Sequence, residues 1–115
     1  MVALLVLSTF PDRETALRVG NTLVEEQLVA CASIVPGVES IYRWQGKIER
    51  SAEVLVIFKT LTERYYAVEE RIRQLHPYEV PEILAIDPKS GLPAYLQWVE
   101  ANSSGAEPAS PVSEP

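Results

Sequence analysis

The sequence has few of the residues that disulfide bonds, histidine-dependent catalytic sites or nucleic-acid-binding surfaces require. It contains one cysteine and one histidine in 115 residues, so no internal disulfide can form and any imidazole chemistry depends on one side chain. Ten lysines and arginines stand against 16 aspartates and glutamates, and this acidic balance argues against a nucleic-acid partner. No apolar run is long enough to span a bilayer, and Met1 leads into an apolar run without a charged leader. We therefore expect no membrane partner and a cytoplasmic location.

Common catalytic signatures are absent as well. The chain has no G-x-S-x-G, C-x-x-C, H-E-x-x-H or P-loop pattern. After the first apolar run, residues 8–11 lack the glycine-rich anion cradle with an arginine that an acylphosphatase needs. An RNA-recognition motif would need stacking aromatics in a basic setting, which the second long strand lacks. The sequence therefore argues against each of these enzyme classes, and we expect no organic cofactor.

What the sequence does contain is one unusually long β-hairpin. Residues 30–43 and 48–60 are rich in β-formers, and the short polar connection between them holds Gly46, which can take positive φ. A strand of a dozen residues spans about 40 Å, so the hairpin must project beyond so small a body. Pro36 and Gly37 interrupt the first strand and predict a bulge there.

The remaining elements complete a strand, helix, strand, strand, helix, strand order. The apolar run 2–7 predicts a central strand buried on both faces. A helix is expected from Asp12 to about residue 27, and Thr60 or Thr62 is expected to cap a second helix that ends at His76. Residues 80–87 predict the fourth strand. The order is that of the α+β ferredoxin-like βαββαβ sandwich, followed by a short last helix that Pro93 opens.

Composition divides the chain into residues 1–102, one domain, and residues 103–115, a Ser, Pro and Glu-rich tail expected to be disordered. In the ferredoxin-like fold both helices cover one sheet face. Residues 54–58 are nevertheless apolar on both faces, and an open patch of that kind does not suit a soluble monomer. We expect a homo-oligomer in which the hairpin holds a neighbour.

Residues 76–82 gather functional side chains into a short segment that two prolines stiffen. One interpretation is a ligand or metal site made from the imidazole of His76 and the carboxylates of Glu79 and Glu82. The other is structural: His76 caps the preceding helix, Tyr78 packs, and the carboxylates are solvated. Both interpretations stay open at this stage.

Two further groups also allow two interpretations. Cys31 is either a small core residue or a ligand for a soft metal such as copper, for which a thiolate beside an imidazole is suitable. Tyr42 and Trp44 lie near the predicted hairpin tip, and Lys59 ends an apolar run. They predict interface packing with an ion pair or, alternatively, an anion pocket.

Residues 30–47 and 76–82 resemble the two signature blocks of the CutA divalent-cation tolerance family, and the resemblance extends over residues 2–102. It implies a ferredoxin-like subunit, a homotrimer in which long hairpins wrap the neighbouring subunits, and a similarity to the PII signalling trimers. It also implies a role in tolerance to divalent metals, copper above all, with no established catalytic activity.

The same resemblance implies functional residues. For copper or another divalent cation bound near subunit boundaries, the expected ligands are Cys31, His76, Glu79 and Glu82. The alternative function is a PII-like signalling trimer that binds a small anion in intersubunit clefts. Its expected binding residues are Tyr42, Trp44, Lys59 and Tyr78.

Overall fold

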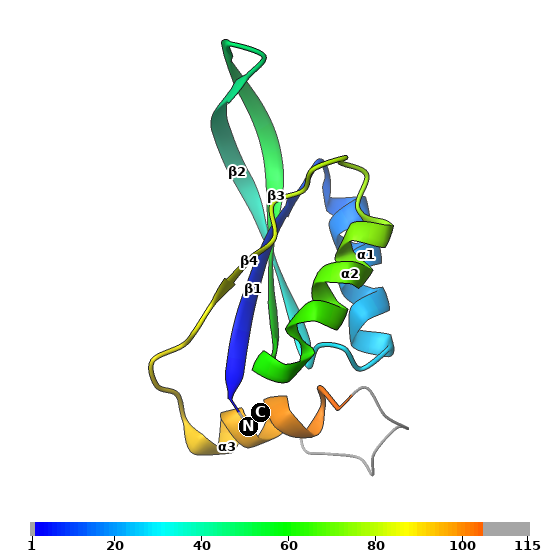
Figure 1. The fold of residues 1–115 in the computed structure, drawn as a ribbon, viewed down its shortest axis with the longest axis vertical. Helices are drawn as coiled ribbons and strands as arrows, with labels where there is room; N and C mark the ends of the chain where they lie inside the picture. The colour runs from blue at the N-terminus through cyan, green and yellow to red at the C-terminus, as the bar shows by residue number, and fades with distance from the viewer. Residues whose placement is uncertain (1, 105–115) are drawn as a thin grey trace.

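The chain forms a four-stranded antiparallel sheet with two helices on one face, as a computed structural model of residues 2–104 shows (Figure 1). The elements are β1 (Ala3–Phe10), α1 (Arg13–Glu25), β2 (Cys31–Trp44), β3 (Lys47–Leu61), a 3-10 turn (Thr62–Arg64), α2 (Tyr65–Leu75), β4 (Leu84–Ile86) and α3 (Pro93–Ala101). The strand order is β2-β3-β1-β4. This architecture confirms the ferredoxin-like prediction.

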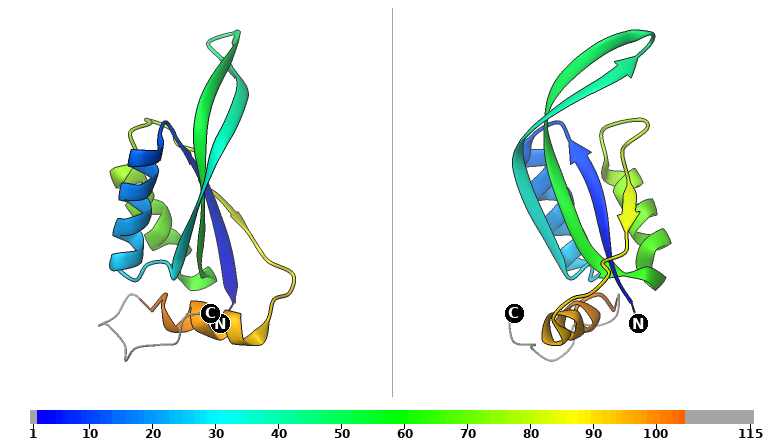
Figure 2. Two further views of the ribbon diagram at one scale, coloured as in Figure 1. Left: turned by 180° about the vertical axis from the view of Figure 1, so that it is seen from behind. Right: turned by 90° about the vertical axis from the view of Figure 1, so that its left-hand side faces the viewer.

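The β2–β3 hairpin extends far beyond the rest of the sheet, and the molecule measures 49 Å along its longest axis (Figures 1 and 2). The strand β1 pairs with β3 only as far as Val54. Residues 38–53, which we call the arm, therefore pair only with one another. At its tip Gln45 and Gly46 both have positive φ, 50° and 79°, the combination of a two-residue type I′ turn. A register shift between Val35 and Val38 confirms the predicted bulge.

The core lies between the sheet and the two helices. Alternate residues of β1 are buried, among them Leu4, Val6 and Phe10, because successive strand residues point to opposite faces. The helix α1 begins after Asp12, whose side chain accepts a hydrogen bond from the Thr15 amide at 2.7 Å. Its buried stripe consists of Ala16, Val19, Gly20 and Leu23. A side chain at Gly20 would come within 3.2 Å of the Ala32 Cβ, so α1 packs closely on β2 at this position.

The second face of the sheet is not covered by helices α1 and α2. Seven apolar residues, which we call the open face, share it according to the strand register: Leu5, Leu7, Val35, Leu55, Ile57, Leu84 and Ile86. All seven keep part of their surface exposed, and Leu84 keeps 56%. The prediction that residues 2–7 are buried on both faces is therefore wrong for the single chain, because in it only one face is fully covered.

The fourth strand is shorter than predicted, three residues instead of residues 80–87. It pairs with β1 only at Leu5–Leu7. Pro81 lacks an amide hydrogen with which to pair, and Val80 is 85% exposed. Farther along β1, the carbonyl of Thr9 contacts the His76 imidazole at 2.8 Å, so a side chain takes the place of a strand partner.

The predicted threonine cap of the second helix is wrong. The 3-10 turn precedes α2, and the helix begins without a side-chain cap. The hydroxyl of Thr60 instead donates to the Leu28 carbonyl at 2.7 Å, and that of Thr62 donates to the Val2 carbonyl at 3.2 Å. Both threonines therefore tie the end of β3 to neighbouring segments. The predicted end of the helix at His76 is confirmed.

The described fold continues slightly past residue 102. Pro93 occupies the first turn of α3 as predicted, and this helix lies across the end of the sheet opposite the arm (Figure 1). Ser103 is buried, and its carbonyl accepts a hydrogen bond from Arg64 at 3.0 Å. The rest of the predicted disordered tail, residues 105–115, lies outside the described residues. No helix within residues 2–104 is long and apolar enough to cross a membrane.

Candidate functional site

His76 is buried at the end of α2, with both ring nitrogens engaged. Its ring stacks on Phe10, with ring centroids 4.4 Å apart. The Nδ1 atom accepts a hydrogen bond from the Tyr78 amide at 3.1 Å, and Nε2 is 2.8 Å from the Thr9 carbonyl oxygen. Because an amide donates and a carbonyl accepts, these contacts assign the neutral imidazole with its proton on Nε2. A metal could bind Nδ1 only if the Tyr78 amide released it.

The surroundings of His76 favour this neutral form. Burial lowers the pKa of His76 below its usual value of 6.5, while the hydrogen bond with the Thr9 carbonyl and the nearby Glu53 carboxylate oppose the shift. Desolvation dominates because a charged imidazolium loses hydration against the Phe10 ring. The neutral ring therefore acts as a structural connector between α2 and β1.

Tyr78 extends this contact to the base of the arm. Its ring lies 4.7 Å from that of His76, and its hydroxyl donates to Glu53 Oε2 at 2.8 Å. Burial is the first cause that raises the pKa of Tyr78, and the hydrogen bond to Glu53 adds to it. Glu53 is only 9% exposed, so this neutral phenol provides a hydrogen bond to a carboxylate that has lost most of its water.

Cys31 lies in a different cluster, at the opposite end of the sheet. It is half-buried and directly opposite Lys59 in the β2–β3 ladder. Lys59 Nζ is 3.6 Å from Cys31 Sγ and donates a hydrogen bond to the hydroxyl of Ser33. Tyr95 of α3 lies nearby; burial raises its pKa, and the charge of Cys31 contributes to the rise. The cluster joins a thiol, an amine and a hydroxyl on the face of the sheet that α1 and α2 leave uncovered.

Within one chain, Cys31 and His76 do not share a site. The rung of Cys31 and Lys59 continues across the sheet to Leu5, whereas His76 contacts Thr9. Four residues of β-strand separate these positions by about 13 Å. His76 also packs on Phe10, whose buried side chain faces the helices, whereas Cys31 belongs to the other face.

Comparison with known proteins identifies the family. The family described as CutA1 divalent ion tolerance protein matches residues 4–102. The chain belongs to the CutA1 divalent ion tolerance family. It is 46% identical over 98 residues to the divalent-cation tolerance protein CutA of Thermus thermophilus, covering 85% of this chain and 95% of that protein.

Other relatives of this CutA1 chain agree in fold. A crystal structure of CutA from Xylella fastidiosa is similar with a TM-score of 0.88 and 39% identity, covering 90% of this chain and 100% of that one. Human protein CutA is 41% identical over 91 residues, which cover 79% of this chain. The match spans 51% of that human protein.

The other two expected metal ligands of the CutA1 chain, Glu79 and Glu82, are exposed on the connection between α2 and β4. Within residues 2–104, no three side chains of His, Cys, Asp or Glu converge as a metal-binding group. Any site that combines Cys31 with these carboxylates therefore has to draw its ligands from more than one chain.

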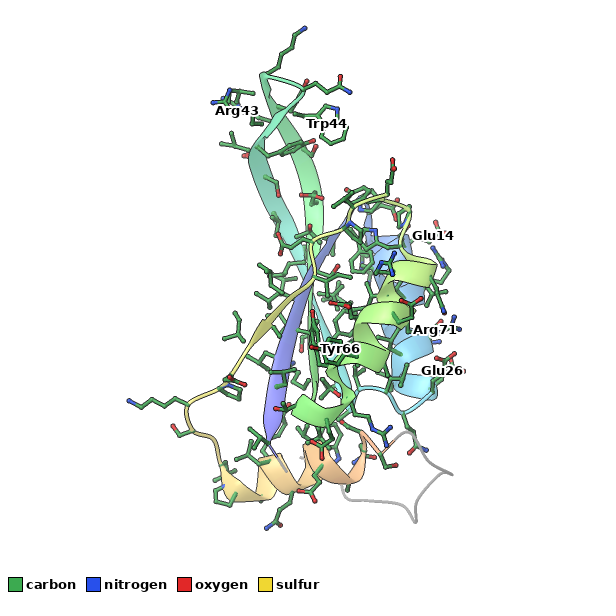
Figure 3. The ribbon with its side chains drawn as sticks, in the orientation of Figure 1. Glu14, Glu26, Arg43, Trp44, Tyr66 and Arg71 are labelled. Carbon is green, nitrogen blue, oxygen red and sulfur yellow. The ribbon has the colours of Figure 1, made fainter. Side chains whose placement is uncertain are left out.

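The residues expected to bind an anion are likewise spread along the hairpin. Trp44 is 60% exposed at the arm tip beside Arg43, and the two side chains point to different sides (Figure 3). The hydroxyls of Tyr42 and Ser51 are 2.7 Å apart. Lys59 lies near the other end of β3, outside the arm. Tyr78 contacts the arm base, as described above, so these residues do not form one cleft within a single chain.

Three residues of the candidate site were missed by sequence analysis. Glu53 lies where β3 changes from alternating to continuously apolar residues, a boundary that indicates a carboxylate at the edge of a core. Thr9 takes part through its backbone carbonyl, which no side-chain pattern reveals. Ser33, the partner of Lys59, could have been found only from the strand register.

Proposed function

We propose that this CutA1-family chain acts in tolerance to divalent cations by binding metal, copper foremost, as a non-enzymatic homotrimer. The observation that carries the proposal is the family match over residues 4–102. Cys31 supplies the soft ligand that copper prefers, and it lies half-buried on the sheet face that α1 and α2 leave uncovered. Glu79 and Glu82 supply exposed carboxylates.

The surface of the chain supports an assembly. The open face exposes large apolar side chains, and the arm presents Ile41 and Ile48, which are 67% and 63% exposed. Apolar surface of this extent is favourably removed from water by contact with another subunit. The proposed site requires a ring of identical subunits in which Cys31 of one chain meets carboxylates of the next and each arm holds a neighbour.

Copper titration of purified protein, with light scattering, tests the proposal. We expect a trimer that binds copper, and Cys31→Ser should weaken copper binding by roughly tenfold or more. Glu79→Gln with Glu82→Gln should weaken it less, since these are harder ligands. His76→Gln is the informative companion, because both ring nitrogens already have partners within the chain; full loss of binding in this variant would assign His76 as a ligand.

Equal copper affinity in the wild-type protein and the Cys31→Ser variant would refute the ligand assignment. A wild-type protein that is trimeric but holds no copper would refute the metal-binding role while leaving the assembly intact.

One observation favours the alternative, a PII-like signalling trimer with an anion site. The polar partners of Lys59 within residues 2–104 are a thiol and a hydroxyl, so its ammonium is available to an anion across a subunit boundary. Tyr42, Trp44 and Tyr78 from a neighbouring chain would have to complete such a cleft. Thermal-shift measurements with nucleotides and carboxylates, compared with a Lys59→Gln variant, separate this function from copper binding.

A further inference from the structure

The contact between Cys31 and Lys59 is imposed by the backbone of the hairpin. The two residues form one rung of the β2–β3 ladder, and the Ala30 amide donates to the Lys59 carbonyl at 2.8 Å. The distance from Lys59 Nζ to Cys31 Sγ is 3.6 Å, and the hydroxyl of Ser33, two residues along the same strand, also holds the nitrogen. Amine and thiol therefore meet in a fixed register.

Lys59 forms no ion pair within residues 2–104. The ion pairs there are Arg71–Glu26, which joins α2 to the end of α1 (Figure 3), and Arg73–Glu70 within α2. Lys59 lies on a partly apolar face, between Ile57 and the buried Leu61. In such surroundings an amine without hydrogen-bond partners is unfavourable, so the contacts of Nζ with nearby polar atoms are maintained. Cys31 is the only cysteine in the sequence, so an intrachain disulfide does not compete for its sulfur.

We propose that Cys31 and Lys59 are the two ends of a redox-sensitive covalent cross-link, an Nζ–O–Sγ bridge formed with dioxygen. The thiol loses its hydrogen and the amine loses one, and new S–O and O–N bonds form. The O=O bond breaks; one oxygen atom enters the bridge and the other leaves as water with the two hydrogens. Sulfur and nitrogen are oxidised and dioxygen is reduced, so the step balances without a further reactant. Excess thiol reductant reverses it: attack on sulfur frees the Cys31 thiol and leaves a hydroxylamine on Lys59, and reduction of that N–O bond returns the amine. In all, four reductant thiols become two disulfides and the bridging oxygen leaves as water.

The bridge would lock the base of the long hairpin. Its ends are 28 positions apart in the sequence, and closing a loop of that size restricts the unfolded chain in the same way as a disulfide. It would also remove the Cys31 thiol and the Lys59 charge from the open side of the sheet. The two groups that the metal and anion proposals use would thus be under a common oxidative control, although the bridge itself depends on neither proposal.

Intact-mass measurement of the full chain tests the cross-link. Protein purified under thiol reductant is divided, and one half is exposed to air after removal of the reductant, with a chelator present so that copper binding does not affect the result. We expect the aerobic sample to gain one oxygen atom, to lose two hydrogen atoms and to lose its free-thiol signal. Reduction should restore the original mass and the free-thiol signal. A peptide map should join the peptides of Cys31 and Lys59.

Matched lysine variants identify the nitrogen. Lys59→Gln should keep its free thiol under air, whereas Lys47→Gln, a change at the arm tip, should form the bridge like the wild-type protein. Circular dichroism confirms that each variant is folded. The proposal is overturned by an unchanged mass in air, by whole oxygen atoms added without loss of hydrogen, as in sulfenic or sulfinic acid, or by equal thiol loss in Lys59→Gln.

Discussion

Ser8 and Thr60 are both fully buried, yet only one of their hydroxyls has a partner. The Thr60 hydroxyl donates to the Leu28 carbonyl at 2.7 Å, whereas the Ser8 oxygen has no hydrogen-bond partner among the described residues. A buried hydroxyl without a partner has lost its water and gained nothing in exchange. The two residues therefore contribute to stability with opposite signs.

We expect Ser8→Ala to raise the free energy of unfolding by about 1 kcal/mol and Thr60→Val to lower it by about 1 kcal/mol. The first change removes an unsatisfied hydroxyl with little change in volume, and the second leaves the Leu28 carbonyl without its donor. Chemical denaturation at one protein concentration measures both. A loss of stability in Ser8→Ala would contradict this account and would indicate a buried water on the hydroxyl.

At the scale of elements, His76 attaches the connection between α2 and β4 to the end of β1. This attachment depends on the neutral imidazole, because Nδ1 must be unprotonated to accept the hydrogen bond from the Tyr78 amide. Burial lowers the pKa of His76 from 6.5, so the unfolded chain binds a proton at a higher pH than the folded one. The contribution of His76 to stability is complete above pH 6.5 and is lost as the pH falls toward the folded-state pKa.

The free energy of unfolding should consequently fall when the pH is lowered from 7.5 to 5.5, and His76→Gln should remove most of that pH dependence. Below about pH 4, a change in the free energy of unfolding reports on Asp12 and Glu26 instead of His76. Hydrogen bonds from Thr15 and Arg71 lower the pKa values of these two carboxyl groups in the folded chain. An identical slope between pH 7.5 and 5.5 in wild type and variant would show that His76 is not the titrating group.

Local signals explain why most elements could be predicted from the sequence. The aspartate before α1, the proline after His76 and the Pro36–Gly37 bulge act through the backbone of their own residues. The length of β4 could not be predicted in this way, because it depends on His76, a distant residue whose imidazole occupies the Thr9 carbonyl. The threonine cap failed for a similar reason, since Thr60 and Thr62 contact segments far away in sequence.

In the candidate site, too, the sequence predicted individual residues but not their contacts with distant parts of the chain. The sequence singled out Cys31, Lys59, His76 and Tyr78, because rare or charged side chains in apolar surroundings are conspicuous. Their partners were not predictable: Cys31 meets Lys59 through strand register, and Tyr78 meets Glu53 across 25 positions. Residue types reveal candidates, but only the fold decides which of them are neighbours.

At the scale of the whole molecule, the arm has two faces of different character. Strand register places Ile41, Arg43, Ile48 and Arg50 on one face and Tyr42, Glu49 and Ser51 on the other. Both isoleucines are more than half exposed, and within residues 2–104 they pair only with other residues of the arm. If the arm holds a neighbouring subunit, the isoleucine face is the one whose burial would gain most free energy.

We expect the double change Ile41→Lys and Ile48→Lys to shift the proposed trimer toward monomer in light scattering. The control, Glu49→Lys with Ser51→Lys, places two lysines on the opposite face of the same arm, changes the net charge by three units instead of two, and should leave the proposed trimer intact. Because the chain carries a net charge of −6, added lysines reduce the general repulsion between subunits. Dissociation would therefore report lost apolar contact, not charge repulsion. A monomeric wild-type protein, or equal dissociation of both double variants, would contradict the role proposed for the isoleucine face.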